Sequence, residues 1–168
     1  MKAFKIITLV VSIFVVSSAG AYAADKDKIG YVDLSRLFDE YYVTKEYDTT
    51  LEAKHKEFEA DRNTKIEKIR ESQGKLGLLS DDKKAALEAE IEQKKADLLE
   101  YDRQQKADLT KERNDKIREI LLEIEGVVST YAEKENYSII LNDRVLIFGQ
   151  QSYDVTEQVL KILNAGKK

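Results

Sequence analysis

The region between Leu34 and Glu135 contains no proline and only three glycines, so little in it can interrupt a helix. Its apolar residues recur at intervals built from three and four, which places them along one face of a helix. In chain order they are Leu37, Phe38, Tyr41, Leu51, Phe58, Ile66, Ile69, Leu76, Leu87, Ile91, Leu98, Tyr101, Leu109, Ile117, Ile120, Ile124, Val127, Val128 and Tyr131. This pattern predicts a helical region of about a hundred residues.

A short interruption divides this region in two. Residues 74–82 read Gly-Lys-Leu-Gly-Leu-Leu-Ser-Asp-Asp, in which the glycines end one helix and Ser80 caps the next. Asp33 is the expected cap of the first helix. Helices of about 43 and 55 residues would reach roughly 65 and 80 Å at 1.5 Å per residue. We therefore expect a long antiparallel coiled-coil hairpin with its tip at residues 74–80.

The apolar face of this hairpin is uneven. It is dense near the base, where we expect Leu34, Leu37, Ile120 and Ile124 to be committed to the core. In the distal arm, residues 51–109, it is interrupted by Arg62, Lys94 and Gln105. Sparse packing predicts a pliable arm above a rigid base. Apolar side chains in the arm and tip have few partners there, so they are the candidates for contact with another protein. They are Phe58, Leu76, Leu78 and Leu79.

Strand-like segments flank the helical region. Residues 28–33 suit a strand, and residues 138–142 and 145–148 are two β-branched and aromatic runs around an Asn-Asp turn, the pattern of a β-hairpin. Because the coiled coil returns the chain to its origin, the first segment can pair with the other two. A final helix is expected over residues 154–164, capped by Asp154 together with Glu157 three residues on.

The strand segments are continuously apolar, which predicts a sheet buried on both faces. One short helix can cover only one face, and three short strands are marginal alone, so the other face calls for self-association. The expected association core is Ile29, Tyr31, Ile139, Leu141, Val145 and Ile147. The fold class is thus mainly α with a small β part. Residues 24–50 and 110–168 form the association domain, from which the distal arm emerges.

The first 23 residues have the layout of an export signal. Lys2 and Lys5 precede an apolar run over residues 6–16, and Ala21-Tyr22-Ala23 matches the pattern that a signal peptidase accepts. The run is about half the ~20 residues that span a bilayer, which favours cleavage after Ala23 over an uncleaved anchor. The chain has no cysteine, so packing or association must stabilise it without disulfides.

The composition argues against several classes of function. With one histidine, His55, and no cysteine, thiolate and histidine-rich metal sites are excluded. No GxxxxGK[ST] motif and no nucleophile–base pattern occurs, so we expect neither an enzyme nor a bound cofactor. Without the first 23 residues, 26 Lys and Arg face 32 Asp and Glu. This acidic balance argues against nucleic-acid binding.

The order of these features resembles the Skp/OmpH family of periplasmic chaperones. The likeness rests on the opening Lys28-Ile-Gly-Tyr-Val-Asp-Leu, the long charged hairpin and the closing Asp154-Val-Thr-Glu-Gln-Val-Leu, and it covers residues 28–163. The resemblance implies a homotrimer in the periplasm, with strands in a small central barrel and three helical arms around a cavity. It also implies that unfolded outer-membrane proteins are held in that cavity without ATP.

The chain differs from the best-known members of this family in net charge, because they are basic and this chain is acidic. Strong attraction to lipopolysaccharide or anionic lipid is therefore not expected. The tip itself, residues 65–84, has a small excess of basic residues. Its leucines either pack the turn or touch a client or a membrane surface. The alternative to a holdase is a structural or adaptor coiled coil of the envelope that docks one defined partner.

Overall fold

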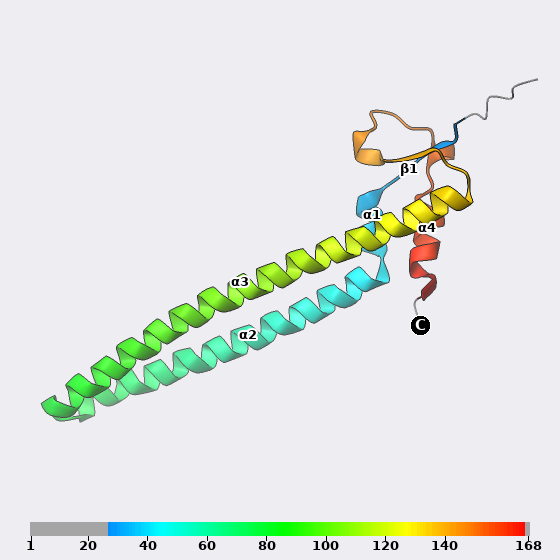
Figure 1. Cartoon of the computed structure of the whole chain (residues 1–168). Coiled ribbons are helices and arrows are strands. Elements are labelled where there is room, and N and C mark those ends of the chain that lie inside the picture. Colours follow the sequence, from blue (N-terminus) through cyan, green and yellow to red (C-terminus); the bar gives the residue numbers. More distant parts are fainter. Residues whose placement is uncertain (1–26, 167–168) are drawn as a thin grey trace, which may run out of the picture.

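The chain folds into a small body and one long helical arm (Figure 1). The computed structural model describes residues 27–166, so the predicted signal peptide, residues 1–23, lies outside the described part. The elements in order are β1 (Ile29–Val32), α1 (Leu34–Glu40), α2 (Tyr42–Lys75), α3 (Asp81–Lys134), β2 (Ile139–Asn142) and α4 (Thr156–Leu163). The predicted class, mainly α with a small β part, is confirmed.

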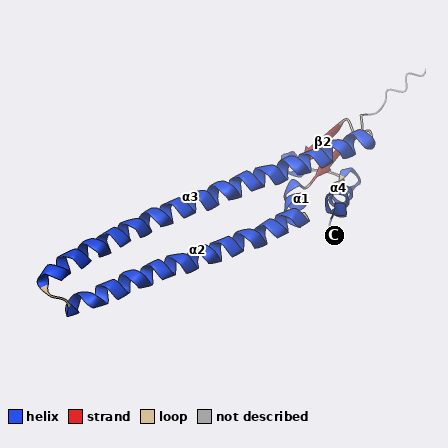
Figure 2. Ribbon diagram, turned by 60° about the horizontal axis from the view of Figure 1, so that its bottom comes forward, coloured by secondary structure: helices blue, strands red, loops and turns tan. Residues whose placement is uncertain are grey.

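Helices α2 and α3 form the predicted hairpin. They run side by side from the body to the tip, where a short 3-10 turn, Leu76–Leu78, joins them (Figure 2). Ser80 occupies the position before α3 as predicted, but its side chain makes no capping hydrogen bond there. Its carbonyl instead accepts from the amides of Lys83 and Lys84.

The first helix is not continuous, contrary to the prediction. Asp33 caps α1 as expected and accepts from the Arg36 amide at 2.8 Å. The helix stops at Tyr41, whose backbone is extended, with φ −67° and ψ 129°. The side chain of Asn164 occupies the break, because it accepts from the Tyr42 amide at 2.9 Å and donates to the Glu40 carbonyl at 3.2 Å. The backbone groups freed by the break are thereby satisfied.

The sheet has two parallel strands. Ile29 pairs with Ile139 and Val32 with Asn142, so the hairpin does return the chain to its first strand. The predicted strand over residues 145–148 does not form in this chain. Asn142 accepts from the Arg144 amide and starts a 3-10 turn, Asp143–Val145, after which the chain loops outward. On its other edge, β1 has one isolated parallel bridge, between Tyr31 and Asp154.

The core lies where α1, α3 and α4 meet below the sheet. Leu37, Ile120, Ile124 and Val159 are completely buried there, and Tyr41 is 2% exposed. The predicted commitment of Leu37, Ile120 and Ile124 to the core is confirmed. Leu34, which the same prediction placed with them, packs against this core but is only half-buried.

The last helix begins two residues later than predicted. Asp154 still stabilises its start, because its carboxylate accepts from the Thr156 amide at 2.9 Å and from the Thr156 hydroxyl at 2.5 Å. The expected partnership of Asp154 with Glu157 is replaced by an ion pair between Glu157 and Arg36 of α1. Helix α4 is thus tied to α1 at its first turn.

The end of α3 directs the chain into β2. Asn136 adopts a left-handed backbone with φ 57°, and the Tyr137 amide donates back to the Ala132 carbonyl at 2.8 Å. The Lys28 ammonium donates to the Glu135 carbonyl at 2.8 Å, where a cation suits a helix C-terminus. The start of the folded chain therefore meets the end of α3 at this corner.

Candidate interaction surfaces

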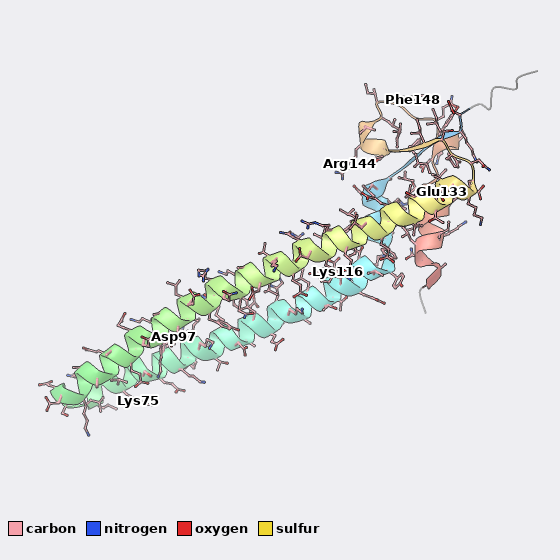
Figure 3. The ribbon with its side chains drawn as sticks, in the orientation of Figure 1. Lys75, Asp97, Lys116, Glu133, Arg144 and Phe148 are labelled. Carbon is pink, nitrogen blue, oxygen red and sulfur yellow. The ribbon has the colours of Figure 1, made fainter. Side chains whose placement is uncertain are left out.

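The predicted association core is exposed in the single chain. The exposed fractions are 42% for Ile29, 48% for Ile139, 70% for Val145 and 106% for Ile147, and Leu141 is also exposed. Tyr31 is half-buried. Sequence reasoning missed Phe148, which is 80% exposed at the outer edge of the same loop (Figure 3). Contiguous apolar exposure of this kind marks an interaction surface.

This apolar surface is hollowed. A cavity of about 310 Å³ opens between the sheet and the loop that follows it. Its lining is Ile29, Gly30, Tyr31, Leu141, Leu146, Phe148, Gly149, Gln150 and Tyr153. The Tyr31 ring lies directly on Gly149, where a Cβ atom would come within 2.7 Å of it. Only glycine permits this approach, so Gly149 helps to shape the surface.

A second hollow lies at the shoulder between α1 and α3. It has a volume of about 410 Å³, and its lining is Leu34, Ser35, Phe38, Asp39, Ile117, Leu121, Asn142 and Arg144. The Arg144 guanidinium hydrogen-bonds to the Ser35 hydroxyl and so ties the loop after β2 to α1. Arg144 stands above α1 in Figure 3.

The arm is held by a seam in which polar side chains alternate with apolar ones. Ile69, Ile91 and Leu109 are its buried apolar residues. Between them, Arg62 pairs with Asp102 at 2.9 Å, Lys54 with Glu112 at 2.5 Å, and Lys94 with the Ser72 hydroxyl at 3.0 Å. Arg62 and Lys94, which interrupt the apolar pattern in the sequence, therefore bridge the two helices. Pairs that remain partly open to solvent contribute little stability each, so the arm is held less firmly than the base.

The predicted contact residues of the arm fall into two separate places. Phe58 lies mid-arm, where its ring packs on Tyr101 with centroids 5.8 Å apart. Leu76, Leu78 and Leu79 lie at the tip, where Leu78 is 85% exposed and the other two are half-buried. Lys75, labelled at the far end of the arm in Figure 3, marks the tip. The structure does not bring Phe58 and the tip leucines together.

Two tyrosines show how burial differs between base and arm. Burial of the Tyr41 side chain, together with its hydrogen bond to Glu123 at 2.6 Å, raises the pKa of this phenol well above its ordinary value. Partial burial, with Asp61 nearby, also raises the pKa of Tyr101. Both phenols are therefore neutral hydrogen-bond donors at neutral pH.

Residues 27–166 contain no group of three or more His, Cys, Asp or Glu side chains arranged to hold a metal ion. His55, the single histidine, is exposed on α2. In the same range no helix is both long and apolar enough to cross a membrane.

Comparison with known proteins places these surfaces in context. The sequence profile of a family described as "Outer membrane protein (OmpH-like)" matches residues 28–163. Among solved structures, the chain is similar to the crystal structure of a candidate OmpH-like outer membrane chaperone from Caulobacter crescentus. The two are 12% identical, the match covers 83% of this chain and 85% of the other, and the TM-score is 0.77. This likeness shows a shared fold. No curated protein matches the chain.

Proposed function

The chain belongs to the OmpH-like outer membrane protein family, and we propose that it is a periplasmic holdase that keeps unfolded outer-membrane proteins soluble without ATP. The family confirms the resemblance seen in the sequence, and the fold confirms its architecture of a long hairpin on a small body. The observation that carries the proposal is the contrast between an apolar, uncovered body surface and a long arm whose seam mixes charged pairs with apolar side chains.

The body surface is the proposed site of trimer formation. Ile29, Ile139 and Leu141 expose their side chains from a sheet of only two strands, which is marginal alone. The loop over residues 145–148 extends beyond that sheet with its apolar side chains in solvent. Three copies that share these surfaces would remove them from water, which stabilises the assembly by roughly 25 cal/mol per Å² of apolar area buried.

The arms are the proposed client-holding surface. An unfolded client offers many weak apolar and polar contacts, and three arms tethered to one body multiply them into avidity. The protein's own packing leaves Phe58 in the arm half-buried and Leu78 at the tip exposed. A client can therefore be held without competing with the core around Ile120 and Ile124.

A holdase of this design needs no ATP. Binding free energy alone sets how much client is protected, and release follows when a competing partner or folding offers a lower free energy. The predicted export signal would place the chaperone in the periplasm, where its clients pass in the unfolded state.

Protection from aggregation tests this proposal. A denatured outer-membrane barrel protein is diluted into buffer with and without the chaperone, light scattering follows aggregation, and the chaperone's mass is measured in the same buffer. We expect a trimer that suppresses scattering of several unrelated barrel proteins, in the presence of a chelator and without nucleotide. Protection of one protein only would instead indicate an adaptor that docks a defined partner.

A further inference from the structure

Two adjoining grooves run along the middle of the arm and share one wall. The proximal groove is lined by Tyr47 of α2 and by residues 108–119 of α3, near Lys116 in Figure 3. The distal groove, of about 390 Å³, is lined by both helices between Lys54 and Asp61 and between Tyr101 and Glu112. Asp108 and Glu112 line both. From Tyr47 to Asp61 this mid-arm groove extends about 20 Å along α2.

Charge in the mid-arm groove is one-sided. Six carboxylates line it against three lysines: Glu57, Asp61, Asp108, Glu112, Asp115 and Glu119 face Lys54, Lys111 and Lys116. Two of the lysines are already used, because Lys54 pairs with Glu112 and Lys116 with Glu119. Within residues 27–166, four of the carboxylates have no ion-pair partner, namely Glu57, Asp61, Asp108 and Asp115.

Aromatic rings supply an independent sign of what this groove accepts. Phe58 and Tyr101 lie together in its wall. The Lys65 ammonium sits over the Tyr101 ring, 4.7 Å from its centroid, so this ring already attracts a cation of the protein itself. At the other end, the Tyr47 hydroxyl is buried and has no hydrogen-bond partner among residues 27–166. A buried hydroxyl without a partner costs free energy, which a polar group of a client that reached it would recover.

The geometry points to the mid-arm groove as a docking site for extended, basic client segments that carry Lys or Arg beside aromatic residues. This inference rests on the proposed function and names the client chemistry. About six residues of extended chain would span the groove. Cationic side chains would meet Glu57, Asp61 and Asp108, while an aromatic side chain would pack beside Phe58 and Tyr101. The carboxylates of the mid-arm groove would thereby favour cationic client segments over acidic ones.

The test uses the full-length trimer and two dye-labelled peptides of eight residues, one alternating Tyr with Arg and the other Tyr with Glu. We expect the Arg peptide to bind at least about tenfold more tightly at low salt, and the difference to collapse in 1 M salt, where the Debye length is about 3 Å. The groove variant combines Glu57→Gln, Asp61→Asn and Asp108→Asn. It should bind the Arg peptide about fivefold or more weakly than the unmodified trimer.

A control variant of equal charge change combines Glu59→Gln, Glu71→Gln and Glu88→Gln, which are exposed residues outside the groove. It should leave Arg-peptide binding within about twofold. Equal binding of the two peptides, or equal weakening by the two variants, would overturn the inference. Both variants are also tested for protection of a denatured barrel protein. If the unmodified trimer protects the barrel protein but either contrary peptide result is obtained, the groove is not the docking site and the holdase proposal is unaffected. If the unmodified trimer gives no protection, the holdase proposal itself is wrong.

Discussion

The side-chain oxygen of Asn164 accepts a hydrogen bond at 2.9 Å from the backbone amide of Tyr42, which lies 122 residues earlier in the sequence. The same side-chain amide donates to the Glu40 carbonyl. One residue near the end of the folded chain thus occupies the break that separates the body helix α1 from the arm helix α2. Tyr41, at that break, is fixed from the other side by its hydrogen bond to Glu123 of α3.

Replacing Asn164 with Ala should lower the free energy of unfolding by about 1–3 kcal/mol, because the Tyr42 amide and the Glu40 carbonyl lose their partner. Urea unfolding measures the change. Asn63→Ala, at an exposed position on α2, is the matched control and should shift stability by less than about 0.5 kcal/mol. Equal effects of the two substitutions would mean that the Asn164 contacts do not stabilise the break.

The break also shows where sequence reasoning ends. Asp33 caps α1 locally, and residues 74–80 mark the tip and the start of α3, so these three places could be predicted from neighbouring residues alone. The stop at Tyr41 depends on Asn164, which no local pattern connects to it. Apolar periodicity even favours a continuous helix through Tyr41, because this side chain does enter the core.

The sheet was partly predictable for a related reason. The apolar run over residues 138–142 found its partner in β1, whereas the run over residues 145–148 has strand propensity but no partner within this chain. Propensity describes fit to a pleated surface and does not say which chain supplies the neighbour. The mid-arm groove was not predicted, since it arises only when α2 and α3 place Glu57 and Asp108 on one surface.

Tyr41 should make stability depend on pH in the alkaline range. Its pKa is raised in the folded state from an ordinary value of 10.0, so the folded protein holds the phenolic proton more tightly than the unfolded chain. The stabilisation is complete below pH 10 and is lost as the pH rises above it. Tyr41→Phe should cost about 1 kcal/mol at pH 7 through loss of the bond to Glu123, and the cost should shrink above pH 10. Thermal unfolding at pH 7 and pH 11 measures both values. A cost that stays constant with pH would contradict this assignment.

The proposed trimer should depend on the exposed sheet. Leu141→Asp would bury a carboxylate without a partner in the association surface, so monomers should replace trimers in mass measurements. Leu99→Asp, at a residue of α3 that is 73% exposed, is the control and should leave the trimer intact. If the Leu141→Asp protein remains a trimer, the surface around β2 is not the interface.

Binding spread over three arms should be insensitive to single changes. Leu79→Ser at the tip should change the free energy of client binding by less than about 1 kcal/mol, the scale of ordinary surface substitutions. Competition with a fluorescent barrel fragment measures it. A loss of tenfold or more in affinity would show that the tip is one strong site.

Removing residues 60–95, the outer part of the distal arm, tests the central claim most directly. A protein without residues 60–95 keeps β1, β2, α4 and the core around Leu37 and Ile120, so its body should still assemble. The measurement is light scattering of a denatured outer-membrane barrel protein in the presence of this shortened protein, with its mass determined in the same buffer. We predict a trimer that has lost most of its protection. A shortened trimer that protects as well as the full-length protein would show that the outer arm, residues 60–95, does not hold the client.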